Sequence, residues 1–165
     1  MKRWMFLCAL MILLTACTRP QTVEVMVQWQ PLLPLEKLRP GNNVSPLRAP
    51  FATHDRQSPL VGYTAAGEID YQIYDARLWP TDVIVVASEA DAPLVFLARS
   101  PHGGCLLRWD STEMRLSDPC SGSHFDLTGQ YLSGPSPRHL DRLPSEVRDG
   151  MIWVRNEIIY GEPHS

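Results

Sequence analysis

From residue 61 onward the chain alternates short apolar runs with turn-forming residues, a pattern that is typical of β-structure. Residues 69–74 (IDYQIY) repeat with a period of two, as expected for a strand with one buried face. Further apolar runs predict strands at residues 83–86, 94–98, 105–109, 114–116 and 151–154. Asp149-Gly150, directly before the last run, indicates a tight hairpin turn. Turn residues recur roughly every 8–12 positions, which predicts a small antiparallel sandwich or barrel.

The chain before residue 61 has a less regular pattern. Thr22 to Trp29 (TVEVMVQW) alternates and is rich in β-branched residues, so it predicts a strand. Residues 30–60 hold six of the fifteen prolines, and we expect mostly irregular chain there. No segment shows a convincing helical period, because the single candidate at 138–147 is interrupted by Pro144. The expected fold class is therefore all-β.

The first residues have the order of a secretory signal peptide. Two basic residues precede an apolar run at 4–14, which is too short to cross a hydrocarbon core of about 30 Å as a helix. The sequence Leu-Thr-Ala-Cys that ends at Cys17 resembles a bacterial lipobox. This implies that residues 1–16 are removed and that acyl lipid, palmitate included, is attached to Cys17, giving a stably membrane-anchored, extracytoplasmic lipoprotein. An ordinary signal peptide or a short anchor with an incidental cysteine is the alternative.

Composition and cysteine count narrow the class further. Residues 1–16 carry two of the fifteen Lys and Arg and none of the eighteen acidic residues, so the remaining 149 residues have a formal charge of −5. This suits one domain plus a tail, and we expect no nucleic-acid binding. Cys105 and Cys120 are left in an exported, oxidising setting, where a disulfide is favoured. Its loop of about 15 residues would contribute roughly 3 kcal/mol. Two free thiols or a two-cysteine metal site are the alternatives.

Two loops carry a family resemblance. The first is SPHGGC at 100–105, after an apolar run, and the second is DPCSGSHFD at 118–126, followed by GPSP at 134–137 and DGMIWV at 149–154. This order resembles the Rieske family, in its cytochrome bc-type branch with a disulfide between the cluster loops. The family shows C-x-H-x-G-C, then C-P-C-H-G-S-x-F-D, then a GPAP-type loop. The resemblance pairs Cys105 with Cys120.

The clear resemblance covers about residues 83–160, and PLEKLRPG at 34–41 is similar to the family's opening segment. It implies a Rieske-type sandwich or barrel at residues 34–165, with a two-loop, cluster-binding-like subdomain at 99–126. Residues 17–33 would be the N-terminal anchor and linker. Residues 49–80 are expected to be an insertion or a diverged part of the base fold.

The resemblance also implies four cluster-ligand positions, which fall on Ser100, His102, Asp118 and Ser121. A Rieske centre takes two thiolates on one iron and two imidazoles on the other. Of the four family ligands only His102 is kept. A serine hydroxyl is a poor ligand, and an aspartate is a hard oxygen donor that poorly replaces a thiolate. We therefore expect no standard [2Fe–2S] cluster and no other resident cofactor.

The loops could also hold a different metal site or a redox-active disulfide. His102, Asp118 and His124 could form a mononuclear metal site, since two histidines and a carboxylate are a known iron set. Otherwise His124 faces solvent and His102 hydrogen-bonds the loop backbone. A redox-active disulfide is less favoured, because the cysteines are not in a Cys-x-x-Cys arrangement. Phe125, Trp109 and Trp153 are expected in the core.

Three functions follow as hypotheses. The first is a non-catalytic, Rieske-fold lipoprotein that serves as an accessory or structural subunit of a membrane electron-transfer complex. The second is an electron carrier with an unusual metal centre, and the third is an envelope lipoprotein with a binding role unrelated to electron transfer. No Ser/His/Asp or paired-carboxylate pattern is specific enough to indicate an enzyme. Other subunits of a membrane redox complex are the expected partners.

Overall fold

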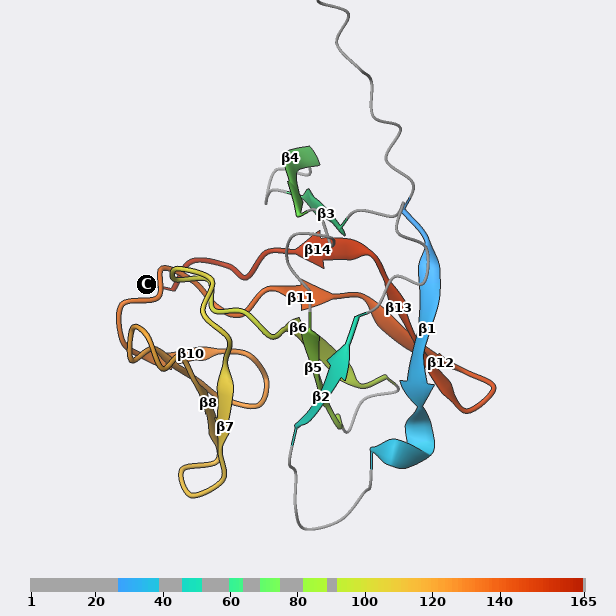
Figure 1. Cartoon of the computed structure of the whole chain (residues 1–165), viewed down its shortest axis with the longest axis horizontal. Helices are drawn as coiled ribbons and strands as arrows, with labels where there is room; N and C mark the ends of the chain where they lie inside the picture. The colour runs from blue at the N-terminus through green and yellow to red at the C-terminus, as the bar shows by residue number, and fades with distance from the viewer. Residues whose placement is uncertain are drawn as a thin grey trace, which may run out of the picture.

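The computed structural model describes residues 27–38, 46–51, 60–63, 69–74, 82–88 and 92–164. The expected signal peptide at 1–16 and lipidation site at Cys17 lie outside these residues. Within them the chain forms three β-sheets and one short 3-10 helix, η1 (Leu35–Lys37) (Figure 1). The prediction of an all-β, mainly antiparallel fold is confirmed.

The largest sheet has seven strands and lies at the centre of the molecule (Figure 1). In spatial order its strands are β2 (Leu47–Pro50), β5 (Asp82–Val86), β6 (Leu94–Leu97), β11 (Arg142–Leu143), β14 (Glu157–Ile159), β3 (Leu60–Tyr63) and β4 (Ile69–Tyr74). Neighbouring strands are antiparallel, except that β14 and β3 are parallel. Strands β3 and β4 come from the 49–80 segment and extend one edge of this sheet.

Two smaller sheets flank the central one on opposite sides (Figure 1). The three-stranded sheet has the order β1 (Trp29–Pro34), β13 (Met151–Arg155) and β12 (Ser145–Arg148). The four-stranded sheet has the order β10 (Tyr131–Ser133), β9 (His124–Phe125), β8 (Arg115–Ser117) and β7 (Arg108–Asp110). The four-stranded sheet and its loops hold the residues that resemble the cluster-binding subdomain.

The predicted hairpin turn is present between β12 and β13. Asp149 has φ of 49° and Gly150 has φ of 72°, so both central residues adopt the left-handed conformation that a two-residue hairpin turn favours. The strands on either side pair in register from Arg148 with Met151 to Ser145 with Val154. A local dipeptide signal therefore fixes the pairing of these two strands.

The proline-rich stretch is more ordered than its sequence predicts. Strand β1 contains Pro31 and Pro34, and β2 ends at Pro50, so the expectation of irregular chain over 30–60 is wrong for these strands. Both strands are at sheet edges, where a residue without an N–H can face away from the ladder. Of the strand expected over 22–29, only Trp29 is in a strand. Residues 27 and 28 are not in a strand, and residues 22–26 lie outside the described part.

Two other strands begin later in the chain than predicted, because loop residues precede them. The run at 105–109 becomes a strand only from Arg108, because Cys105 belongs to a loop in which its carbonyl accepts the Ser100 amide. The run at 114–116 begins at Arg115 instead, since Met114 has φ of 52° and forms the turn before it. Apolar content alone does not separate turn from strand at these positions.

Strand β5 is buried on both faces and so connects the two parts of the core. Val83 and Val85 pack in a cluster with residues of the three-stranded sheet, including Val154. Ile84 and Val86 pack on the other side, in a cluster that includes Phe125 of β9. Full burial of such side chains stabilises by about 1.5–3 kcal/mol each. The central sheet therefore holds the four-stranded sheet in place.

The three aromatic residues that were expected in the core have different positions. Phe125 is fully buried, and half-buried Trp109 packs against the same apolar cluster. Trp153 does not pack inside, so this prediction is wrong. Its neighbours Ile152 and Val154 face the core, and the alternation of the strand turns Trp153 to the opposite face of the sheet.

Two glycines with positive φ offer a matched test of this fold. A Cβ at Gly150 would meet nothing within 4 Å, so we expect Gly150→Ala to lower the free energy of unfolding by about 1–2 kcal/mol through backbone strain alone. At Gly134, which has φ of 102°, a Cβ would lie 2.5 Å from Ser123 Cα. Gly134→Ala should therefore cost roughly 3 kcal/mol or more. Urea denaturation measures both, and equal losses would contradict this packing.

Candidate functional site

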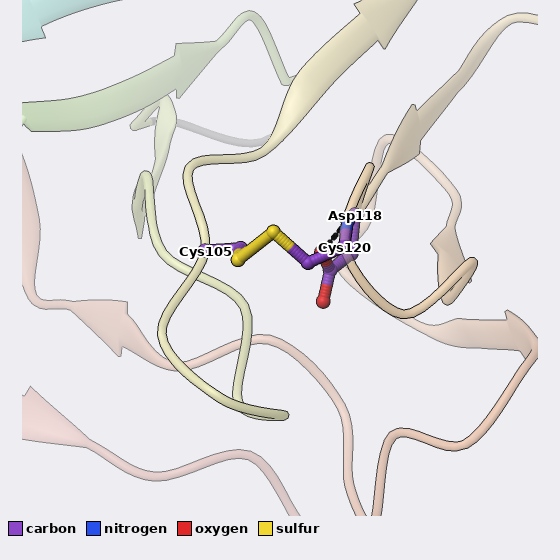
Figure 2. Close-up of side chains that lie close together, drawn as sticks. All are labelled: Cys105, Asp118 and Cys120. Atoms are coloured by element: carbon purple, nitrogen blue, oxygen red, sulfur yellow. Dashed lines mark hydrogen bonds between the residues drawn. A yellow bond between two sulfur atoms is a disulfide. The ribbon is translucent and has the colours of Figure 1, made fainter.

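A disulfide joins the two loops that carry the family resemblance. Cys105 of the first loop and Cys120 of the second are bonded with an S–S distance of 2.02 Å and a Cα–Cα distance of 6.3 Å (Figure 2). Cys105 is half-buried and Cys120 is exposed. The predicted pairing is confirmed.

The first loop is closed by its own serine. The Ser100 amide donates to the Cys105 carbonyl at 2.8 Å, and the Gly104 amide donates to the Ser100 carbonyl at 3.1 Å. The buried Ser100 hydroxyl accepts the His102 amide at 3.1 Å. Gly103 and Gly104 have φ of 78° and 71°, which the tight return of the chain requires. Ser100 thus points into the loop rather than to solvent.

The second loop turns around the Asp118 carboxylate, which is only 1% exposed. Its Oδ1 accepts the backbone amides of Cys120 at 2.9 Å and of Ser121 at 3.3 Å. Its backbone is held as well, since the Asp118 amide donates to the Ser123 carbonyl at 2.8 Å. A short acidic side chain that accepts amides two and three residues ahead is a common way to build such a turn.

Hydroxyl groups connect this carboxylate to the first loop. The Ser121 hydroxyl donates to Asp118 Oδ2 at 2.6 Å, and the Ser100 hydroxyl donates to the same carboxylate. Ser121 Oγ is also 3.0 Å from Ser123 Oγ, which accepts the Ser136 amide at 3.0 Å. Three of the four positions assigned to cluster ligands by resemblance therefore bind one another.

The ionisation of Asp118 follows from this environment. Burial alone would raise the pKa of the Asp118 carboxyl. The hydroxyls of Ser121 and Ser100 and the amides of Cys120 and Ser121 outweigh it, so the pKa lies below its ordinary value of 3.8. At neutral pH the second loop is thus built around a buried negative charge that accepts several hydrogen bonds.

The alternative metal set of His102, Asp118 and His124 is not brought together. The His102 ring is exposed, and His124 Nδ1 lies 3.0 Å from the Ser117 hydroxyl. Among the described residues, the one group of three potential metal ligands with all ligand atoms within 4.8 Å is Cys105, Asp118 and Cys120 (Figure 2). Both sulfur atoms of that group are in the disulfide.

The four assigned positions can be tested for their fit to a [2Fe–2S] group. They offer one imidazole, one carboxylate and two hydroxyls, whereas a Rieske centre takes two thiolates and two imidazoles. The carboxylate already interacts with both hydroxyls. This donor set does not fit a standard Rieske cluster.

A second polar cluster, not expected from the sequence, joins residues 131–141 to residues 161–164. Asp141 is buried and accepts two hydrogen bonds from the Arg138 guanidinium, at 2.9 and 2.8 Å. It also accepts the Gly161 amide at 3.0 Å. The His164 ring stacks on Tyr131 with centroids 3.7 Å apart. Arg138 and Asp141 are three residues apart, but the contacts of Asp141 with Gly161 and of Tyr131 with His164 join distant segments, so no local motif could have indicated these two.

Comparison with known proteins bears on the family. No protein-family model matches the chain. A cytochrome b6-f complex iron-sulfur subunit from Synechococcus elongatus is 33% identical over 75 residues, covering 46% of this chain and 42% of the relative. Iron-sulfur subunit 1 of that complex in a Nostoc species is 30% identical over 87 residues, covering 50% and 49%. These similarities support the prediction of a Rieske-type domain in this chain.

The matched region spans about half the length, or less, of these curated relatives. Among solved structures, the cyanobacterial plasma membrane Rieske protein PetC3 from Synechocystis PCC 6803 is 26% identical, with a TM-score of 0.40, covering 58% of this chain and 84% of that one. Within the described residues of this chain, no helix is long and apolar enough to cross a membrane.

The lowered pKa of Asp118 predicts a specific pH dependence of stability. Ionised Asp118 stabilises the fold above the unfolded-state pKa of about 3.9, and this contribution is lost as the pH falls through the lower folded-state value. We expect Asp118→Asn to lower the free energy of unfolding by about 1–3 kcal/mol at pH 7. The difference from wild type should shrink as the pH falls below 4 or so.

Chemical denaturation over a pH series measures this difference. Asp149→Asn is the matched control, because Asp149 is exposed and asparagine suits its turn position. A deficit of Asp118→Asn that is independent of pH would show that the buried charge contributes nothing.

The same carboxylate should affect how reagents reach the disulfide. An Asp118 oxygen lies within 4.8 Å of both sulfur atoms, so it repels an incoming anionic thiol. We expect the ratio of reduction rates with 2-mercaptoethylamine, which is cationic, and 3-mercaptopropionate, which is anionic, to fall roughly 2–5-fold in Asp118→Asn. Simple destabilisation would raise both rates alike. An unchanged ratio would contradict this electrostatic effect.

Proposed function

We propose that this protein is a membrane-anchored Rieske-fold lipoprotein that lacks a standard [2Fe–2S] cluster. In this proposal it is non-catalytic and serves as an accessory or structural subunit of a membrane electron-transfer complex. The Cys17 lipid holds it on the extracytoplasmic side of a membrane, and its two disulfide-linked loops contact the partner. The polar contacts among the former ligand positions carry the proposal.

The loss of the cluster is supported by the way Asp118 is used. In place of metal bonds, one carboxylate accepts hydroxyl groups from both loops, and a disulfide provides the covalent link. Rebinding of a cluster would require this buried network to be broken. The buried polar groups at the tip therefore have hydrogen-bond partners without iron.

The partner is inferred from the relatives and the tip. The relatives are named as subunits of the cytochrome b6-f complex, so assembly with other redox subunits is the natural expectation for a chain that keeps their scaffold. Leu106 directly follows the disulfide cysteine and is 39% exposed. An apolar side chain at the tip provides a contact for a partner without any electron passing through it.

The anchor is supported by the sequence alone. The Leu-Thr-Ala-Cys motif that ends at Cys17 resembles a lipobox. A multiply acylated cysteine would hold the domain on a bilayer without a membrane-spanning helix. Mass spectrometry of the protein from native membranes would reveal the acyl groups on Cys17.

Restoring the ligands tests the absence of the cluster. We expect the native protein to contain no stoichiometric iron and to give no Rieske-type electron paramagnetic resonance signal after reduction. The triple variant Ser100→Cys, Asp118→Cys and Ser121→His rebuilds two thiolates and two imidazoles, and it should gain both iron and signal. A Rieske-type signal from the native protein would refute the proposal and favour the electron-carrier alternative.

Isolation from solubilised native membranes tests the partner. We expect the protein to co-purify with subunits of a quinol- or cytochrome-linked complex, and Leu106→Asp to reduce this recovery severalfold. Leu132→Asp is the matched control, since Leu132 is an exposed leucine on β10 rather than beside the disulfide. Recovery of free protein alone would favour the isolated envelope lipoprotein.

A further inference from the structure

The outer face of the three-stranded sheet carries an unusual set of side chains. Ile152 and Val154 of β13 point into the core, so the residues that alternate with them along the strand point away from it. The outer residues include Trp29 and Pro31 of β1, Met151, Trp153 and Arg155 of β13, and Glu146 and Arg148 of β12, which we call the Trp/Arg face. The register pairs Trp29 with Arg155 and Pro31 with Trp153, so these residues share one side.

The aromatic rings and guanidinium groups of the Trp/Arg face contact one another. The Arg148 guanidinium lies 5.1 Å from the ring centres of both Trp29 and Trp153. The Arg155 guanidinium lies 5.6 Å from the Trp29 ring centre. Both tryptophans are half-buried, and their contacts with the guanidinium groups give the outside of the sheet an amphipathic surface.

The charges of this surface are balanced. Arg148 forms an ion pair with Glu146, and Arg155 forms one with Glu157. The face therefore has no excess charge to select a strongly anionic partner. It combines large apolar rings with polar groups, which is the chemistry that suits the boundary between lipid headgroups and acyl chains.

The position of the Trp/Arg face along the chain brings it close to the proposed anchor. Only eleven residues separate Cys17 from Trp29. Such a segment spans at most about 40 Å when fully extended, so an acylated Cys17 keeps β1 near the bilayer. Trp29 is the first residue of β1, which is an edge strand of its sheet.

We propose that the Trp/Arg face lies on the headgroup region of the bilayer that holds the anchor. This inference rests on the lipid anchor of the proposed function and adds an orientation to it. In Figure 1 the three-stranded sheet and the four-stranded sheet with the disulfide loops lie at opposite ends of the molecule. Contact through the Trp/Arg face therefore leaves the Cys105–Cys120 tip extended away from the lipid.

Tryptophan fluorescence measures this contact. The lipidated protein is reconstituted into phosphatidylcholine vesicles, with and without lipid brominated near the headgroup. We expect bromine to quench wild-type emission, and Trp29→Phe and Trp153→Phe each to lose roughly half of the quenched component. Trp109→Phe is the matched control, because Trp109 belongs to the four-stranded sheet; it should lose emission but keep the quenched component.

Vesicle flotation separates failure of the anchor from failure of the orientation. Protein that does not float with vesicles would refute both the anchor and this inference. Protein that floats but shows no bromine quenching would refute the orientation alone. Quenching that survives in the Trp29→Phe, Trp153→Phe double variant would likewise overturn it.

Discussion

The organisation of the tip depends on one buried carboxylate. Asp118 accepts amides from its own loop and a hydroxyl from each loop, so a single side chain sets the shape of the second loop and its distance from the first. In the Rieske family that task belongs to iron bonds. A carboxylate can take it over because its two oxygens accept several hydrogen bonds at once. The charge is tolerated in a buried place because the donors are already oriented around it.

The loops also need a firm base, and the central sheet provides it. Strand β5 packs on one face against the three-stranded sheet and on the other against the sheet that carries the loops. A change at the tip is therefore opposed by packing on both sides of this strand. The buried Asp141 carboxylate, which accepts the Gly161 amide, and the stacked Tyr131 and His164 rings add contacts with the end of the chain.

Local signals made the fold class, the Asp149-Gly150 hairpin and the disulfide predictable from the sequence. The fold class and the hairpin follow from short sequence patterns, and the disulfide follows because only two cysteines remain to pair. The edge strands with proline were missed, since a proline lowers strand propensity unless the position in the sheet is known. The site was predicted as four positions, but not as a network. Hydrogen bonds among Ser100, Asp118 and Ser121 depend on loops that are joined only in three dimensions.

The Cys105–Cys120 bond has a consequence for how such a domain changes over generations. Its covalent link between the loops is made by residues other than the assigned ligands. A domain whose loops were joined by iron alone would unfold locally with the first ligand substitution, and selection would remove it. Here the covalent link between the loops does not depend on which residues occupy the assigned ligand positions. Under the proposed function, the disulfide would let cofactor chemistry be lost step by step while the architecture stays available for a new use.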